Sequence, residues 1–325
     1  MSTQQYLRKV SIVIGSAGGD ALEFSDFRVR FAVRRGDIQT PNTATVRIYN
    51  LAQQTAQRIR DEFSTVVLQA GYDGNFGIIF QGTIKRVYRG RESPTDSYVE
   101  VVAADGDSAY NYATVATSLP AGKTYHDQID VALGAMKPFN VTDGYVPKDA
   151  PVNGLPRGKV VYGMARDVMR QACENLGSAW SIQDGKINVI PLTSYMPGDV
   201  PEITAATGLL GLPQQTLNGI ELKMLLNPSI KIGALIHLNN TSIQQQRFGL
   251  TQSAQAGIDL INQGIHFDDD GYYYVMVADH VGDTRGNEWQ TEVTCLATNA
   301  VVPIGLQQRS TTQAVGPQDG IVRRG

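Results

Sequence analysis

The sequence predicts a β-rich α+β fold in which two strand-rich regions flank a small mixed module. Short runs of alternating apolar and polar residues recur through residues 1–105 and 197–300, and this period of two is typical of half-buried strands. Helical spacing of apolar residues is concentrated in the middle third. The 33 glycines among 325 residues allow the many turns that short strands need.

The first region, residues 1–105, contains about six predicted strands and one helix. The helix places Ala52, Ala56, Ile59 and Phe63 on one face, and Asn50 before it is a suitable N-cap. Short connections between the strands fit a small barrel or sandwich with the helix packed on one side. The predicted strands are residues 7–14, 27–33, 43–48, 66–70, 78–88 and 98–104.

Residues 106–196 form a predicted α+β module. Prolines and glycines make residues 138–158 a long irregular connection, and Gly177 is placed to end the last helix. Asp184-Gly185 is a favoured pair for a tight hairpin turn. The predicted elements are a weak helix at 106–116, firmer helices at 125–136 and 162–176, and a hairpin at 179–190.

From residue 197 to residue 300 the sequence is again rich in predicted strands. Residues 207–213 are predicted as a loop, and residues 241–264 receive no assignment. The tail, residues 301–325, is rich in Gly, Gln, Pro and Arg, so we expect it to be disordered alone and to order against a partner. The predicted strands are residues 219–225, 233–238, 271–279 and 288–297.

The composition is that of an ordinary globular protein, with 42% hydrophobic and 18% charged residues. A net charge of −3 disfavours a dedicated nucleic-acid-binding protein. The sequence has neither a long apolar segment nor an apolar secretory signal, so we expect synthesis in the cytoplasm. Cys173 and Cys295 lack metal-ligand spacing and are expected to be buried free thiols.

His266 and His280, with nearby aspartates, come nearest to a metal or acid–base cluster. Their spacing matches no standard zinc or calcium loop, so a solvated turn between strands is the favoured interpretation. Gly122-Lys123-Thr124 is the end of a phosphate-binding loop motif, but Thr117 stands where its first glycine belongs. We therefore predict no catalytic, metal or cofactor-binding residue and no cofactor. The aspartates concerned are Asp268, Asp269, Asp270, Asp279 and Asp283.

Basic residues crowd the polar faces of the predicted strands in the first region. They form either a solvated sheet face or a surface that lines a tube or meets a neighbouring ring, where charge sets the register. The candidates for a tube-lining or interface role are Arg28, Arg30, Arg47, Lys85 and Arg86.

Several segments resemble phage tail baseplate hub proteins of the T4 hub type, and they occur in the same order as in that family. In the first region they are Pro41-Asn42, Ile48-Tyr49-Asn50-Leu51, Ala70-Gly71-Tyr72 and Ile79-Phe80-Gln81-Gly82. In the last region they are residues 207–238, and residues 272–277 followed by residues 282–289.

The resemblance implies two β-barrel-like tube domains, at 1–105 and 197–300, around the middle module. It implies a homotrimer whose six similar domains form a ring joining the tail tube to the central spike of a virion, of the contractile-tail type, assembled in the host cytoplasm. Implied partners are the tail tube protein and the central spike protein, with tape-measure and baseplate wedge proteins as further neighbours. The genome would pass through the central channel without specific recognition.

The main alternative is a tail-tip cell-wall hydrolase or another tail-associated enzyme. Such an enzyme needs a carboxylate pair or a metal cluster, and the middle module is poor in His, Cys and paired acids. A nucleic-acid-binding module is disfavoured by the net charge. We therefore expect a structural protein and no enzymatic activity.

Overall fold

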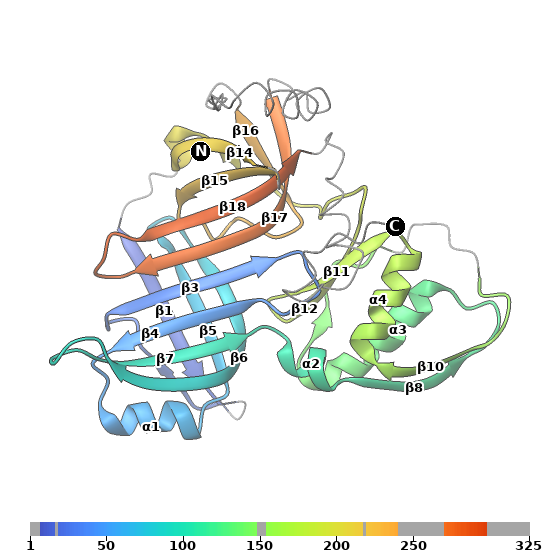
Figure 1. The fold of residues 1–325 in the computed structure, drawn as a ribbon, viewed down its shortest axis with the longest axis horizontal. Coiled ribbons are helices and arrows are strands. Elements are labelled where there is room, and N and C mark those ends of the chain that lie inside the picture. Colours follow the sequence, from blue (N-terminus) through green and yellow to red (C-terminus); the bar gives the residue numbers. More distant parts are fainter. Residues whose placement is uncertain (1–6, 17–18, 148–153, 217–218, 240–269, 298–325) are drawn as a thin grey trace, which may run out of the picture.

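The computed structural model describes residues 7–16, 19–147, 154–216, 219–239 and 270–297. Most strands belong to one thirteen-stranded sheet, beside which the middle module forms two small sheets and its own helices (Figure 1). Among the residues described, no helix has the length and apolar character to cross a membrane.

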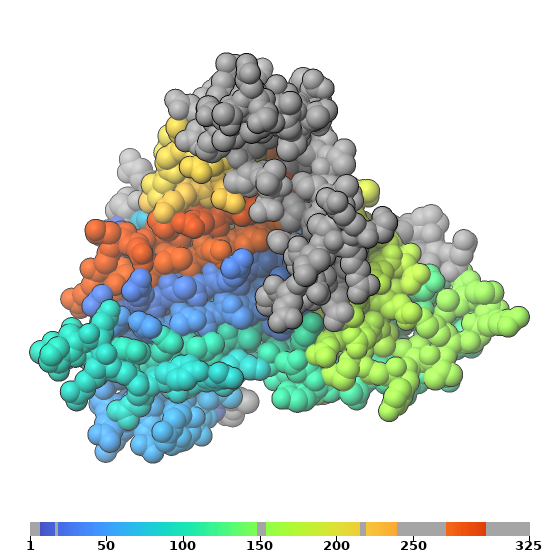
Figure 2. Space-filling model, viewed as in Figure 1, coloured from blue at the N-terminus to red at the C-terminus, as the bar shows by residue number. Residues whose placement is uncertain are grey.

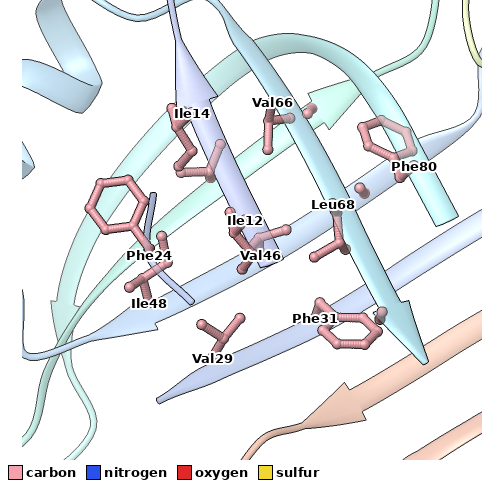
Figure 3. Packing of buried hydrophobic residues seen from close by; sticks show 14 of the residues in the cluster. Ile12, Ile14, Phe24, Val29, Phe31, Val46, Ile48, Val66, Leu68 and Phe80 are labelled. Carbon is pink, nitrogen blue, oxygen red and sulfur yellow. The ribbon is translucent and has the colours of Figure 1, made fainter. Parts of the chain in front are cut away.

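The N-terminal strands form a sheet that curls around its own core in the order β3-β4-β7-β6-β5-β1-β2. Isoleucine, valine and leucine side chains of β1 and β5 lie across valine, isoleucine and phenylalanine side chains of β3 and β4 (Figure 3), so one apolar core fills the curl. The elements are β1 (Arg8–Gly15), β2 (Ala21–Glu23), β3 (Val29–Gly36), β4 (Thr43–Tyr49), α1 (Gln53–Asp61), β5 (Thr65–Tyr72), β6 (Asn75–Arg91) and β7 (Ser97–Ala104).

The middle module has a separate core in which α4 packs against both α3 and strand β11 of the β11–β12 hairpin. A Thr124–Asp127 capping box begins α3, because each side chain accepts from the other residue's backbone N–H. The elements are α2 (Asp107–Tyr112), β8 (Thr114–Leu119), α3 (Tyr125–Met136), η1 (Lys137–Phe139), β9 (Thr142–Asp143), β10 (Lys159–Met164), α4 (Ala165–Asn175), β11 (Ser178–Gln183) and β12 (Lys186–Pro191).

The C-terminal strands continue the large sheet in the order β14-β15-β18-β17, with β16 and β13 beyond β17. They enclose a third core that includes Ile220, Leu222, Tyr273 and Val293. The elements are β13 (Glu202–Ile203), η2 (Ala205–Thr207), β14 (Leu209–Thr216), β15 (Gly219–Leu225), β16 (Leu235–Asn239), β17 (Asp270–Asp283) and β18 (Trp289–Ala297).

Strand β17 joins the N-terminal and C-terminal strands into one sheet. Along one edge it pairs with β18. Along the other edge, residues 270–274 pair with β16 and residues 277–283 pair with β3. The surfaces of β17–β18 (orange) and β3–β4 (blue) therefore border each other in the space-filling view (Figure 2).

The curled N-terminal sheet is not a closed barrel, which corrects the barrel-like expectation: in the described part of the chain, β1 and β3 do not pair. The start of β18 covers the open side instead. Trp289 is buried edge-on against Phe31, with ring centroids 5.4 Å apart, and its Nε1 donates to the carbonyl of Gly71 at 3.2 Å. Arg8 of β1 donates to the carbonyl of Gly286 at 2.6 Å.

Helix α1 confirms the predicted strand–helix–strand segment, with two local corrections. Ala56, Ile59 and Phe63 are buried, but Ala52 is exposed because it is the residue that precedes the first helical turn. Asn50 does not cap the helix. It has a positive φ of 57°, and its side-chain oxygen accepts from the backbone N–H of Ser97 at 3.0 Å.

Three strand assignments are also corrected. The predicted loop at 207–213 runs into β14, which pairs with β15 across a bulge. β8 and β10 form a two-stranded ribbon where helices were predicted at the end of 106–116 and the start of 162–176. β17 continues to Asp283 beyond the predicted end at residue 279, since pairing with β3 holds these residues extended. Residues 241–264 and the tail 301–325 lie outside the described residues.

We expect Phe63→Ala to lower the free energy of unfolding by about 3–5 kcal/mol, the usual range for emptying a core aromatic site. Phe63 is buried in the N-terminal core beyond the end of α1, under the guanidinium of Arg58. Denaturant unfolding measures the change. Tyr162→Ala, at a side chain that is 84% exposed, is the matched control and should cost little. An equal decrease in the free energy of unfolding of the two variants would contradict the burial of this helix face.

Candidate assembly surface

One continuous polar face runs across the outer side of the large sheet. Its side chains alternate with the core residues of the same strands, and the strand registers place them in rows. Five cations and four carboxylates share this face, so its net charge is small. The polar face comprises Glu221, Lys223, Gln290, Glu292, Asp279, Arg30, Arg34, Thr43, Thr45, Arg47, Glu100, Arg86 and Tyr88.

Cross-strand ion pairs tie this face together. Lys223 Nζ lies 3.1 Å from Glu292 Oε1, and Arg34 Nε lies 3.9 Å from Asp279 Oδ1. The second pair crosses the junction between β3 and β17. Exposed pairs of this kind contribute at most about 1 kcal/mol each, so they set register more than stability.

Three of the five predicted basic residues lie near each other on β3 and β4. Arg30 stands directly opposite Arg47 in the ladder. Arg30 Nη2 is 3.3 Å from Glu288 Oε2, and Arg47 Nε donates to Glu100. Arg28, at the entry to β3, places its Nη2 2.9 Å from Asp283 Oδ2. The guanidinium groups of Arg28 and Arg47 also stack on tyrosine rings, over Tyr49 and Tyr98 respectively.

The other two predicted basic residues lie on β6, farther along the sheet. Lys85 is the extra residue of the β6 bulge against β7, and its ammonium group pairs with Asp107 of α2. Arg86 donates to the hydroxyl of Tyr88 at 3.3 Å. Each of the five predicted basic side chains therefore has a polar partner. Three of the five lie at β3 and β4, and the other two lie on β6.

Protonation behaviour follows these contacts. The hydrogen bond to Asp283 raises the pKa of Arg28, and the bond to Glu100 raises the pKa of Arg47. Burial opposes ionisation of Asp283, yet the bond from Arg28 and the backbone N–H of Arg285 leave the pKa of this carboxyl below its usual value. All three groups therefore stay charged across the neutral range.

A buried polar junction connects the N-terminal strands to the middle module. Arg35 of β3 is only 3% exposed. Its guanidinium donates to the carbonyl of Ile79 at 3.2 Å, to Gln183 Oε1 at 3.3 Å and to Asp184 Oδ2 at 2.8 Å. A buried guanidinium needs such partners, because an unpaired buried charge is strongly destabilising.

The same junction holds the β11–β12 turn by further hydrogen bonds. Asn42 Nδ2 donates to Gln183 Oε1 at 2.8 Å, and Gln183 Nε2 donates to the carbonyl of Gly36 at 2.8 Å. Asp105 Oδ1 accepts from the backbone N–H of Gly185 at 2.9 Å. The predicted Asp184-Gly185 turn is therefore confirmed, and it has a docking role that local sequence does not reveal.

The structure gives the described members of the predicted histidine–aspartate group no common site. His280 is fully buried in β17 with Nδ1 2.9 Å from Thr291 Oγ1, and burial lowers its pKa to about 3. Asp283 forms an ion pair with Arg28. His280 and Asp283 both pair with β3 as part of β17, so they belong to a strand and not to a solvated turn. His266, Asp268 and Asp269 lie outside the described residues. Within the described residues, no three His, Cys, Asp or Glu side chains are grouped as a metal would require.

A surface pocket of about 550 Å³ lies beside the Trp289 contact. Its lining combines basic groups such as Arg8 and Arg285 with the rings of Phe27 and Phe76, and Asp26 is its carboxylate. A glycosidase uses two carboxyl groups flanking the bond that it cleaves. Among the described residues that line this pocket, Asp26 is a single carboxylate and not such a pair.

Comparison with solved structures gives extensive fold similarity at low sequence identity. The 43 kDa tail protein of prophage MuSo2 from Shewanella oneidensis matches 90% of this chain and 99% of its own, with a TM-score of 0.57 and 8% identity. A tail protein from Neisseria meningitidis matches 89% of this chain and 96% of its own, with a TM-score of 0.54 and 12% identity. No family model and no curated protein sequence matches the chain.

A third similar structure is an Escherichia coli protein described as a component of the type VI secretion system that resembles the T4 tail proteins gp27 and gp5. It matches 92% of this chain and 79% of its own, with a TM-score of 0.50 and 10% identity. The chain therefore has the fold of phage tail proteins and of a related secretion component. At these identities the similarity concerns the fold alone.

We expect Asp105→Asn to remove a pH dependence of stability. Asp105 is 2% exposed, and burial raises its pKa to about 6 from an ordinary value near 4. The folded protein thus holds this proton more tightly than the unfolded chain, and stability falls as pH rises from 4 to 6. The amide keeps an acceptor for Gly185 without the buried charge.

Denaturant unfolding at several pH values tests this expectation. The stability of the variant relative to the natural protein should rise by roughly 2–3 kcal/mol between pH 4 and pH 6.5. Asp20→Asn, at an exposed carboxylate, is the control and should leave the pH profile unchanged. Parallel profiles for Asp105→Asn and the natural protein would refute the buried-carboxylate account.

Proposed function

We propose that this chain is a structural subunit of a phage tail baseplate, in the hub position that joins the tail tube to the central spike. The observation that carries the proposal is the shared fold with phage tail proteins over nine-tenths of the chain and nearly all of two of those proteins. The match covers nearly the whole length of those two proteins, so the likeness extends over the complete fold and is not confined to one common module.

In this role the chain is a homotrimer, with the strands of 1–105 and 197–300 forming a ring around a channel and 106–196 at its side. Its partners are the tail tube protein and the central spike protein, with tape-measure and wedge proteins farther away. The ring is assembled in the host cytoplasm and becomes part of a virion with a contractile tail.

The charge pattern of the polar face fits the wall of such a channel. Arg30, Arg47 and Arg86 would face the channel together with Glu100 and Glu292, and most of these charges are paired across strands. Paired charges produce a weak field at a distance, so DNA passing through would be neither held nor strongly repelled. Arg28 and Lys85 sit at the margin of this wall and hold Asp283 and Asp107.

Co-expression with the tail tube and spike proteins of the phage that encodes the chain tests the proposal. We expect copurification of all three and a mass of about 106 kDa for the hub alone, three times the chain mass of 35.3 kDa. Light scattering measures the mass of the hub alone, and native mass spectrometry identifies the proteins in the copurified complex. The tube protein of an unrelated phage is the control and should not copurify.

Failure to bind either partner, combined with peptidoglycan clearing on a zymogram, would replace the hub role with the hydrolase alternative. A steep salt-dependent affinity for DNA would argue against a channel wall that the genome passes without recognition.

A further inference from the structure

The order of strands in the large sheet occurs twice. The N-terminal series β3-β4-β7-β6-β5-β1 has the same chain-order pattern as the C-terminal series β14-β15-β18-β17-β16-β13. Neighbours are antiparallel throughout both series except at β13, which runs parallel to β16. β6 therefore corresponds to β17, and β3 corresponds to β14.

A shared irregularity supports this correspondence. The β6–β7 ladder shifts register between Ile84 and Arg86, and the β17–β18 ladder shifts between Val275 and Val277. In each case one extra residue, Lys85 or Met276, lies on the longer strand. Because a bulge can occur at any point of a ladder, its presence at the same point of both series is independent evidence of equivalence.

The two series meet inside the chain through one pair of edges. Residues 277–283 of β17 pair with β3, with Asp279 opposite Arg34 and Val281 opposite Ala32. The equivalent edges are the second half of β6 and the outer edge of β14. Neither has a strand partner in the described part of the chain, since β6 pairs with β5 only up to Thr83 and β14 pairs only with β15.

We propose that the second half of β6 pairs with β14 of a second copy of this chain, in the same way that β17 pairs with β3. The proposal rests on the ring of identical subunits in the proposed function and identifies the contact that closes it. The register follows from the equivalences. Arg34 of β3 is equivalent to Thr216 of β14, and Asp279 of β17 is equivalent to Tyr88 of β6. Because Asp279 pairs with Arg34 within the chain, Tyr88 of one copy stands opposite Thr216 of the next. One position further along, Arg89 stands opposite Gln215.

The composition of the two edges fits a selective contact. β6 carries Lys85, Arg86, Arg89 and Arg91 along this half, and such charges oppose indiscriminate strand pairing. Pro213, which has no N–H to donate, lies in the β14 bulge outside the paired residues 214–216. One copy offers β6 and the next offers β14, so the contact is head-to-tail and forms a ring when its rotation closes.

Disulfide trapping in the full chain tests the register. A disulfide needs two Cα atoms within about 7 Å and Cβ atoms that point toward each other. On neighbouring strands, matched positions meet both conditions, whereas positions offset by one residue point to opposite faces of the sheet and positions several residues apart are too distant. We expect Tyr88→Cys/Thr216→Cys to give covalent multimers on mild oxidation, and an equal mixture of the two single variants to give dimers only. The natural Cys173 and Cys295 are buried and should not contribute.

The control is Tyr88→Cys/Leu210→Cys, whose second position lies on the same strand but out of register, and it should give no multimers. Arg89→Cys/Gln215→Cys tests the neighbouring pair in case one variant misfolds, and thermal unfolding checks that each variant retains its fold. Each pair is oxidised in the purified protein and in purified tail particles.

The outcomes separate this proposal from the proposed function. Particles that contain the chain but give no multimer with either pair would overturn the β6–β14 contact and leave the hub role standing. Multimers in solution, with the chain absent from particles, would support the contact and overturn the hub role. If the out-of-register control gives as large a yield of covalent multimers as both matched pairs, the proposed β6–β14 register is wrong.

Discussion

The union of the N-terminal and C-terminal strands in one sheet depends on the pairing of β17 along both of its edges. This strand pairs with β18 along one edge, and with β16 and then β3 along the other. Tyr273 and Val275 therefore belong to the C-terminal core, and the residues that follow them pair with a strand of the N-terminal core. A slip of one residue would turn these side chains from the core to the polar face. The placement of each series of strands therefore fixes that of the other.

The junction at Arg35 places the middle module by a different kind of constraint. Its hydrogen bonds are directional and buried, whereas the hydrophobic effect that stabilises the apolar cores on either side has no preferred direction. Buried ion pairs add little net stability because desolvating both charges is costly. The contribution of Arg35 and Asp184 is orientation, since other placements of the β11–β12 turn would leave a buried guanidinium unpaired.

Local patterns in the sequence predicted the elements whose structure is decided locally. Alternation in β4 and β5, the apolar spacing of α1 and the Asp184-Gly185 turn all have causes within a few residues. β14 was not predicted because Gly211 and Pro213 indicate a loop, while pairing with β15 across a bulge makes the segment a strand. The last residues of β17 resemble a turn and are extended only because β3 pairs with them.

The candidate surface was predictable to the same extent. Basic residues on alternating positions of β3 and β4 indicated a polar face, and the face exists. Their partners could not be inferred, because Arg28 and Asp283 are 255 positions apart in the chain. The Arg35 junction gave no signal in the sequence, since a single arginine beside a strand end has no local feature that marks it as buried.

The pairing of β3 with β17 also has a consequence for synthesis on the ribosome. β3 is complete at Gly36, but its partner ends at Asp283, almost 250 residues later. At ~5–20 residues per second, the edge of β3 waits roughly 12–50 s for that partner, while other nascent chains of the same protein emerge nearby. Arg30 and Arg34 project from the waiting strand, and their charge disfavours pairing with a neighbouring nascent chain. The same arginines then meet Glu288 and Asp279 once the last hairpin has been made.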